Sequence, residues 1–408
     1  MAKILSWNTL ESGEGGAWSN GWGCPLEIER RSTLIQSIIE QDGSAYEDAK
    51  REAEQWLAQD RYKRIRKTLL DEIQKEAVDF LLFQECTVGD FWDEPSECSN
   101  EDSDKAFFEM FDSLYEKVPC QAADEVITEE TVQQVYVRRK SGWKTLFSVP
   151  LQSKAFVGGC LAEFQQSCSD SDPKCPSLTL VNVHGKSRTM RDPELLRESI
   201  SNLWEEIGSH LDSNDDDAWK SRIVLCGDWN THLTDLIEPF SSVNSNGGLE
   251  PIVGMLDNAT ATTDYPFFST NHEDGFLAQY DGCLFFGAPS VTGMQSYLEL
   301  EETSWNMTGF MPKGRDGQLS EWYPMYNNFT YINENNREGV YLNGAFLPGT
   351  TDSQGLSDHL RIYTKIRINK NEKSNDAGLQ LPSEVYQRRP YREYVDSDND
   401  SGSKRLRG

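Results

Sequence analysis

Short apolar runs recur along most of the chain, and they constrain its fold more than any other feature of the sequence. Each run is rich in β-branched and aromatic residues, and most are bounded by Gly, Asp, Asn or Ser, which is the pattern of a β-strand. The runs are residues 3–7, 78–84, 132–138, 157–164, 178–183, 222–226, 280–286, 290–298 and 359–368. We therefore expect a protein built mainly around β-sheets.

Helical periodicity separates only some of these runs. The apolar residues between positions 195 and 211 fall on one helical face, and Asp192-Pro193 before them provides an N-cap and a proline at the first helical position. Residues 26–39 and 104–118 are expected helices, and the charged segment 46–77 is expected to form one or two surface helices. Because many strands have no helix between them, we predict an α/β (α+β) fold, a four-layer sandwich of two packed, mainly antiparallel β-sheets flanked by helices.

Charge and hydropathy limit where in the cell this protein is expected and which partners it can bind. The 408 residues carry a net charge of -28, which argues against a broad basic platform for nucleic acid or an anionic membrane. No run of 18 apolar residues occurs, so no transmembrane helix is expected. The N-terminus lacks the charged and apolar regions of a signal peptide. We therefore expect an intracellular protein of the cytoplasm or nucleus.

The nine cysteines include no Cys-x-x-Cys pair. Cys86, Cys160, Cys226 and Cys283 lie in apolar, strand-like runs and are expected to be buried thiols. A zinc site or a disulfide framework is therefore not expected, and a reducing compartment is favoured.

Polar residues stand at one end of six of the expected strands. They occur in Trp7-Asn8, Gln84-Glu85, Val183-His184, Gly227-Asp228-Trp229-Asn230, Tyr280-Asp281 and Ser357-Asp358-His359. If these strands are neighbours, the polar groups converge at one rim of the sandwich. Hard oxygen ligands together with two imidazoles suit Mg²⁺ or Mn²⁺.

Each of these groups also has an ordinary structural explanation. Gly-Asp-x-Asn is a common turn, a glutamate at a strand end is often solvated, and Ser-Asp-His can cap an element. Asp281 is harder to explain in this way, because it starts an apolar run and burial of a carboxylate without a partner costs several kcal/mol. The joint occurrence of the six groups, in this order, is what indicates a site.

The six groups resemble the motifs of the endonuclease/exonuclease/phosphatase superfamily. This superfamily includes deoxyribonuclease-like and abasic-site nucleases, tyrosyl-DNA phosphodiesterases, deadenylases, inositol-polyphosphate 5-phosphatases and neutral sphingomyelinases. The matching strings are Ile4-Leu5-Ser6-Trp7-Asn8, Phe83-Gln84-Glu85, Val181-Asn182-Val183-His184, Gly227-Asp228-Trp229-Asn230, Tyr280-Asp281-Gly282 and Ser357-Asp358-His359. The resemblance covers about residues 1–368 and implies a four-layer α/β sandwich.

The resemblance assigns three residues to a divalent metal, Mg²⁺ or Mn²⁺. Glu85 would ligate the ion, Asn8 would be a ligand or would support one, and Asp358 would support the site.

The resemblance also implies five catalytic residues. Asp228 would orient and deprotonate the attacking water, and Asn230 would hold the water or the phosphate. His359 would bond a phosphoryl oxygen, with Asp281 fixing its tautomer and charge, and His184 would stabilise the transition state from the opposite side.

Three basic residues follow His184 in this acidic chain. Lys186, Arg188 and Arg191 are either phosphate contacts at the rim of the site or part of a solvated loop, and the sequence leaves both readings open.

The domain prediction has two parts. Residues 1–368 form the catalytic domain, with insertions near 42–77, 93–105, 166–177 and 299–351. The last of these is expected to be a long loop with aromatic anchors, and residues 369–408 are expected to be a flexible polar tail.

The resulting hypothesis is a divalent-metal-dependent phosphoesterase that hydrolyses phosphodiester bonds, acting on DNA or RNA. An inositol-phosphate or phosphoinositide phosphatase and a sphingomyelinase-like hydrolase are alternatives within the same superfamily. A catalytically inactive scaffold that binds a protein partner through its aromatic insertion is an alternative of another class. It is disfavoured because a binding module has no need of such a polar rim.

Overall fold

The computed structural model describes most of the first 369 residues. The described ranges are 1–9, 25–86, 102–120, 132–167, 175–211, 217–244, 248–254, 270–271, 277–278, 280–288, 296–306, 330–334, 337–342, 345–348, 359 and 361–369. The chain separates into two compact units, Met1–Asn371 and Glu372–Gly408. The described residues all belong to the first unit, so the predicted polar tail stays a prediction. None of the described helices is long and apolar enough to span a membrane.

Sheet A has six strands in the order β13-β17-β1-β2-β4-β3. β1 and β2 run parallel, and the other neighbouring strands run antiparallel. The strands are β1 (Ala2–Asn8), β2 (Phe80–Cys86), β3 (Tyr115–Lys117), β4 (Val132–Arg138), β13 (Leu298–Asn306) and β17 (Arg361–Ile368).

Sheet B also has six strands, in the order β5-β6-β7-β8-β12-β9. Here β7 and β8 run parallel and the other neighbours antiparallel. The strands are β5 (Trp143–Leu151), β6 (Phe156–Gln166), β7 (Ser177–Gly185), β8 (Ile223–Asp228), β9 (Glu250–Gly254) and β12 (Asp281–Gly287). The prediction of two mainly antiparallel sheets is confirmed.

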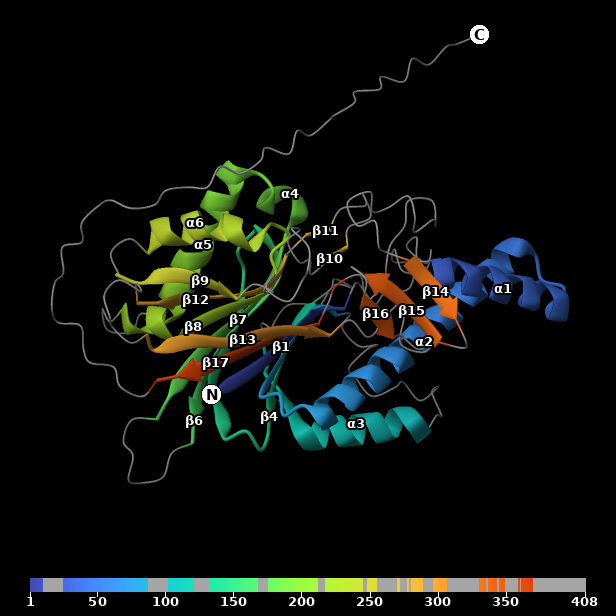
Figure 1. Ribbon diagram of the computed structural model, residues 1–408, viewed down its shortest axis with the longest axis horizontal. Helices are drawn as coiled ribbons and strands as arrows, with labels where there is room; N and C mark the ends of the chain where they lie inside the picture. The colour runs from blue at the N-terminus through green and yellow to red at the C-terminus, as the bar shows by residue number, and fades with distance from the viewer. Residues whose placement is uncertain are drawn as a thin grey trace, which may run out of the picture. The chain divides into compact units, whose positions relative to one another are not determined.

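Helices and the two sheets form four layers (Figure 1), and a hydrophobic core lies between each layer and the next. Alternate residues of sheets A and B face each other in the inner core, for example Ile4 and Leu82 against Leu180 and Val224. The outer face of sheet A is covered by α2 (Tyr46–Lys75) and α3 (Asp102–Leu114). The outer face of sheet B is covered by α4 (Ser187–Met190), α5 (Pro193–Leu211) and α6 (Ile237–Val243) with the 3-10 turn η3 (Leu233–Leu236). A second 3-10 turn, η2 (Asp217–Arg222), precedes β8.

Helix α5 forms where its periodicity predicts it. Asp192 Oδ1 accepts hydrogen bonds from the backbone N–H groups of Glu194 and Leu195, at 2.9 and 3.1 Å. These bonds satisfy two donors that a helix start leaves unpaired, so the predicted N-cap is confirmed. The buried stripe of Leu196, Ile200, Leu203 and Ile207 then faces sheet B.

The charged segment before β2 is a single 30-residue helix, α2, rather than two. Its first half forms a helical hairpin with α1 (Pro25–Asp42) through buried Ile35, Ile38, Ala49 and Ala53. Its last turns, with Ile65, Leu69 and Ile73, belong to the outer layer of sheet A, so this half of the helix is part of the core.

The segment 299–351 is not one long loop. Its first residues belong to β13 of sheet A, and a separate sheet is formed by β14 (Thr330–Glu334), β15 (Arg337–Leu342) and β16 (Ala345–Pro348). A two-stranded sheet pairs β10 (Thr270–Asn271) with β11 (Leu277–Ala278). The aromatic anchors expected between residues 307 and 329 lie outside the described residues.

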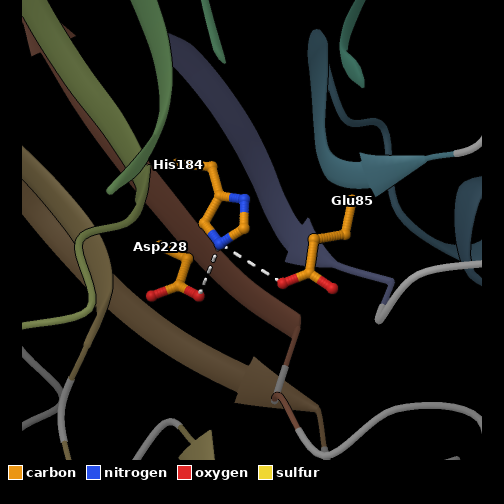
Figure 2. A group of neighbouring side chains, drawn as sticks. All are labelled: Glu85, His184 and Asp228. Carbon is orange, nitrogen blue, oxygen red and sulfur yellow. Dashed lines mark ion pairs between the residues drawn. The ribbon is translucent and has the colours of Figure 1, made fainter. Parts of the chain in front are cut away.

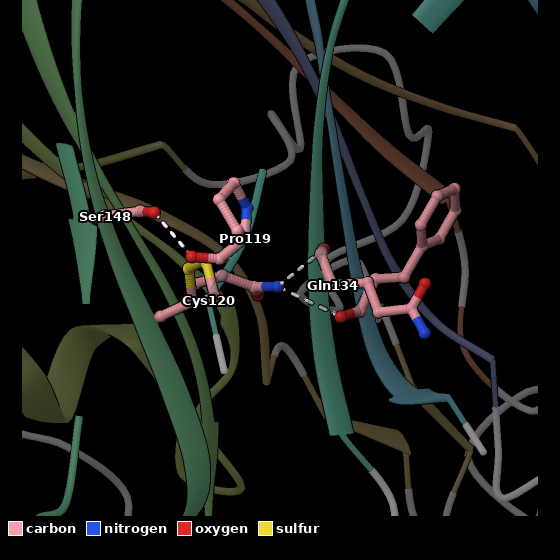
Figure 3. Close-up of a disulfide and its surroundings, with 7 residues drawn as sticks. Pro119, Cys120, Gln134 and Ser148 are labelled. Atoms are coloured by element: carbon pink, nitrogen blue, oxygen red, sulfur yellow. Dashed lines mark hydrogen bonds between the residues drawn. A yellow bond between two sulfur atoms is a disulfide. The ribbon is translucent and has the colours of Figure 1, made fainter. Parts of the chain in front are cut away.

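A disulfide joins Cys120, just after β3, to Cys160 in β6, with 5.6 Å between the Cα atoms (Figure 3). Beside it, the Ser148 hydroxyl donates to the Pro119 carbonyl at 2.6 Å. The expectation that Cys160 is a free buried thiol is therefore wrong, because the two cysteines come together only through the packing of the sheets. Disulfides persist mainly in oxidising compartments, so the predicted intracellular location loses one of its premises and stays a prediction.

The disulfide gives a stability prediction. It joins cysteines that are 40 residues apart in the sequence. Cys120→Ala should therefore lower the free energy of unfolding by about 2–4 kcal/mol, chiefly because the unfolded chain gains conformational entropy. Urea unfolding followed by circular dichroism measures this change. Cys175, which is partly exposed and forms no disulfide, provides the matched control as Cys175→Ala. Equal unfolding midpoints for the two variants would contradict the prediction.

Candidate functional site

Sheets A and B face each other across the inner core, and the polar residues at the strand ends lie on these two inner faces. Along β7, Leu178 and Leu180 pack in that core, and the same face continues with Asn182 and His184. The parallel partner β8 places Asp228 beside His184, and the antiparallel partner β12 places Asp281 beside Asp228. The apolar interior thus becomes polar at one end, as the sequence predicts.

Glu85 reaches this end through an irregularity in β2. The pairing with β4 shifts register between Phe83 and Cys86, so two residues of β2 are bulged. Glu85 itself has a φ of 53°, which is uncommon for a residue other than glycine. Such bulges change the direction of a side chain, and strained backbone of this kind concentrates at functional sites.

The turn after β8 aims Asp228 into the site. Gly227 has a φ of 146°, and a Cβ atom there would lie 1.9 Å from the Val183 carbonyl oxygen, so only glycine fits. The backbone N–H of Asn230, at a φ of 52°, donates to Asp228 Oδ1 at 2.8 Å. Trp229 between them is fully buried in the outer core of sheet B and anchors the turn.

Asn8 and His184 bring the carboxylates of the two sheets together. The Asn8 side-chain amide donates to Glu85 Oε1 at 2.9 Å and to Asp228 Oδ2 at 3.0 Å. His184 Nε2 lies 3.2 Å from Glu85 Oε1 and 3.7 Å from Asp228 Oδ2. Figure 2 shows the imidazole pointing at both carboxylates. Asn8 thus donates to one carboxylate of each sheet, and its role toward a metal stays a prediction.

The donor set of this cluster fits a divalent cation. One ligand atom each of Glu85, His184 and Asp228 lies within 4.8 Å of the others, and Asp228 is only 1 % exposed. Two carboxylates this close repel each other, and a cation that contacts both relieves the repulsion. Oxygen ligands favour Mg²⁺ or Mn²⁺ over softer ions.

A second pair stands on the other side of Asp228. His359 Nδ1 lies 2.9 Å from Asp281 Oδ2, and both residues are buried. His359 Nε2 lies 3.8 Å from Asp228 Oδ2. The other ring nitrogen is therefore directed at the carboxylate cluster while the first faces Asp281, an arrangement that orients the imidazole.

Two buried amides support the site from below. Gln84 Nε2 donates to Asn182 Oδ1 at 2.6 Å, and Asn182 Nδ2 donates to the carbonyls of Phe83 and Gln134 at 3.0 and 3.1 Å. These bonds join sheet B to two strands of sheet A directly beneath Glu85. Both residues stand in the motif strings, but the sequence analysis gave them no role. The sequence does contain a signal for both residues: each is an amide at a position where the alternation of the strand places its side chain in the inner core.

Asn230 also contacts the cluster directly. Its Nδ2 lies 3.3 Å from His184 Nε2 and from Asp228 Oδ2, and donates to the Gly185 carbonyl at 3.0 Å. Of the predicted site residues, seven therefore meet in one place: Asn8, Glu85, His184, Asp228, Asn230, Asp281 and His359. Asp358 lies outside the described residues.

The three predicted substrate-binding residues are exposed: Arg188 lies in α4, and Lys186 and Arg191 stand directly before and after it. The guanidinium of Arg191 lies 5.6 Å from the ring centre of Tyr280, the residue before Asp281. His232 packs edge-on against the same ring, at 5.5 Å between centres. Burial raises the pKa of Tyr280 to about 12, and burial lowers the pKa of His232.

Comparison with solved structures gives weak but extensive matches. TDP2 of D. rerio, complexed with a single-strand DNA product, is 10% identical with a TM-score of 0.40, over 90% of this chain and 98% of that one. An endonuclease/exonuclease/phosphatase family protein from Leptotrichia buccalis is 10% identical with a TM-score of 0.39, over 90% and 100%. The Xenopus laevis APE2 catalytic domain is 13% identical with a TM-score of 0.36, over 89% and 91%. No protein-family model matches, and neither does any curated protein.

Proposed function

We propose that this chain hydrolyses phosphodiester bonds with the help of a divalent cation, Mg²⁺ or Mn²⁺. The observation that carries the proposal is the meeting of Glu85 from sheet A with Asp228 from sheet B, next to the buried His359–Asp281 pair. Phosphoester hydrolysis needs carboxylates that bind a cation, a carboxylate that accepts a proton from water, and an imidazole that donates to the phosphate. The matched structures bear the names of such enzymes, but the proposal rests on the side chains.

Glu85 would hold the cation, with Asn8 fixing the direction of its carboxylate and Asp358 as a further supporting residue. The bound cation would supply neutralisation of charge on the non-bridging oxygens and a lower pKa for water at the site. No other metal ligand is needed for the roles assigned below.

The remaining polar groups would act on water and phosphate. Asp228 would accept the proton of the attacking water through Oδ2, the oxygen that lies 3.7 Å from His184 Nε2 and 3.8 Å from His359 Nε2. With Nδ1 donating to Asp281, a doubly protonated His359 would donate from Nε2 to a phosphoryl oxygen. His184 and Asn230 would hold charge that develops on the opposite side.

Nucleic acid, DNA or RNA, is the substrate class that we favour. A panel with Mg²⁺ and Mn²⁺ tests it: single- and double-stranded DNA, RNA, poly(A), a 5′-tyrosyl DNA, inositol phosphates and sphingomyelin. Hydrolysis of inositol phosphates or of sphingomyelin alone would assign the chain to one of the two alternatives. Binding of a protein partner without turnover of any member would favour the inactive scaffold and overturn the proposal.

The basic residues near α4 should act in binding. The triple variant Lys186→Ala, Arg188→Ala, Arg191→Ala should raise KM about tenfold or more at nearly constant kcat, because substrate phosphates carry the same charge in the ground and transition states. It should also flatten the dependence of kcat/KM on salt. Lys117, Lys140 and Lys144, which are exposed on the strands β3 to β5 and the turn between them, supply a matched triple-alanine control. A loss of kcat at unchanged KM would contradict the assignment.

A further inference from the structure

A buried ion pair lies behind the site, between α2 and sheet A. Arg361 Nη2 is 2.6 Å from Glu72 Oε1, and the two residues are 1 % and 7 % exposed. The other Glu72 oxygen accepts a hydrogen bond from the Tyr363 hydroxyl at 2.7 Å. The Arg361 guanidinium also lies over the ring of Trp7, 4.9 Å from its centre. Glu72 of α2 thus binds two residues of β17, and Arg361 of that strand in turn lies over Trp7 of β1.

Both strands carry residues of the proposed site close to these contacts. Trp7 directly precedes Asn8, and Arg361 is two residues after His359. β1 and β17 pair with Ser6 opposite Ile362, which puts Trp7 and Arg361 at the next position along the two strands. The ion pair therefore fixes the backbone at the points where β1 ends and β17 begins.

The pair is poorly explained as a source of stability. Burial raises the pKa of Glu72, and the nearby Arg361 guanidinium offsets this only in part. A carboxyl whose pKa is higher in the folded chain than in the unfolded chain makes folding less favourable as pH rises through the interval between the two values. Replacing such a buried pair by apolar side chains of similar size is often neutral or stabilising. A role other than stability must then account for it.

We propose that Glu72 and Arg361 are positioning residues that hold His359 and Asn8 in register for the reaction. The inference rests on the proposed phosphoesterase function. Without the pair, the start of β17 is held only by its strand neighbours, and His359 loses its fixed distance to Asp228. A displacement of about 1 Å in an acting group costs on the order of 100-fold in rate, so the effect should appear in kcat.

The test is the double variant Glu72→Leu/Arg361→Met, which removes both charges and leaves neither one buried alone. We expect a melting temperature equal to or above that of the wild type, a kcat lower by about 10- to 100-fold, and a KM within about threefold. The control is Glu301→Leu/Lys365→Met, an ion pair between β13 and β17 further along the same strand, at 3.3 Å. It should leave kcat unchanged.

The same pair of substitutions is then made in a His359→Ala background. If Glu72 and Arg361 act through His359, the loss in kcat there should shrink to about threefold or less. An unchanged kcat in the double variant, or an undiminished loss without His359, would overturn the inference while wild-type turnover still supports the proposed function. Absence of turnover in the wild type would instead defeat the proposed function itself.

Discussion

We expect Asp228→Asn to lower kcat by about two to four orders of magnitude, with little change in fold or in KM. Asparagine has the same shape and keeps the hydrogen bond from the Asn230 N–H, but it cannot accept a proton from water. His359→Ala should have a loss of similar size, because it removes the donor expected to meet the charge that grows on the phosphate. Steady-state kinetics on the best substrate of the panel measures both effects.

Two controls keep this result interpretable. Circular dichroism and thermal unfolding establish that each variant is folded, and Asp192→Asn, a change at the exposed N-cap of α5, tests for a general effect of losing a carboxylate near the site. Near-normal kcat in Asp228→Asn would remove Asp228 from the chemical step. If His359→Ala has the kcat of the wild type and a raised KM, then His359 acts in substrate binding only.

Removal of divalent cations should abolish turnover, and Mg²⁺ or Mn²⁺ should restore it. The reason is the close approach of Glu85 and Asp228, whose mutual repulsion a bound cation would relieve. Glu85→Gln should weaken cation affinity by about 10- to 100-fold, and raised metal concentration should recover part of the activity. Isothermal titration of the metal provides a readout that does not depend on turnover.

The matched control for this experiment is Glu163→Gln, a partly buried carboxylate in the middle of β6 that contributes to neither carboxylate–histidine cluster. It should leave the metal affinity unchanged. Full activity after exhaustive treatment with EDTA, or equal metal affinity for Glu85→Gln and the wild type, would contradict a metal-dependent mechanism.

The strand ends could be predicted because local sequence determines them. Asn8, His184, Asp228 and Asp281 continue the inner-facing period of apolar strands, so one sequence pattern places both the core and the site. The order of these groups indicated that they converge. Glu85 was also found, but its positive φ and the bulge that directs it depend on the pairing of β2 with β4 and leave no local signal.

Contacts between distant segments were the part that the sequence did not predict. Cys120 meets Cys160 only because the chain after β3 packs against sheet B. The charged pattern of α2 indicated a surface helix, whereas Glu72 is buried against Arg361 near the other end of the chain. In both cases the sequence shows the residue type and leaves the partner undetermined. The domain insertions and the role of Asp358 stay predictions.

The division of the site between two sheets constrains how this protein can vary. Glu85 is attached to sheet A and Asp228 to sheet B, so the thickness of the inner core sets the distance between them. A larger or smaller side chain at Leu82 or Val224 would change that thickness even where the fold tolerates it. The helix-covered cores do not set this distance. Mutational tolerance should therefore be lower in the inner core than in the helix-covered cores, for reasons of catalysis rather than of folding.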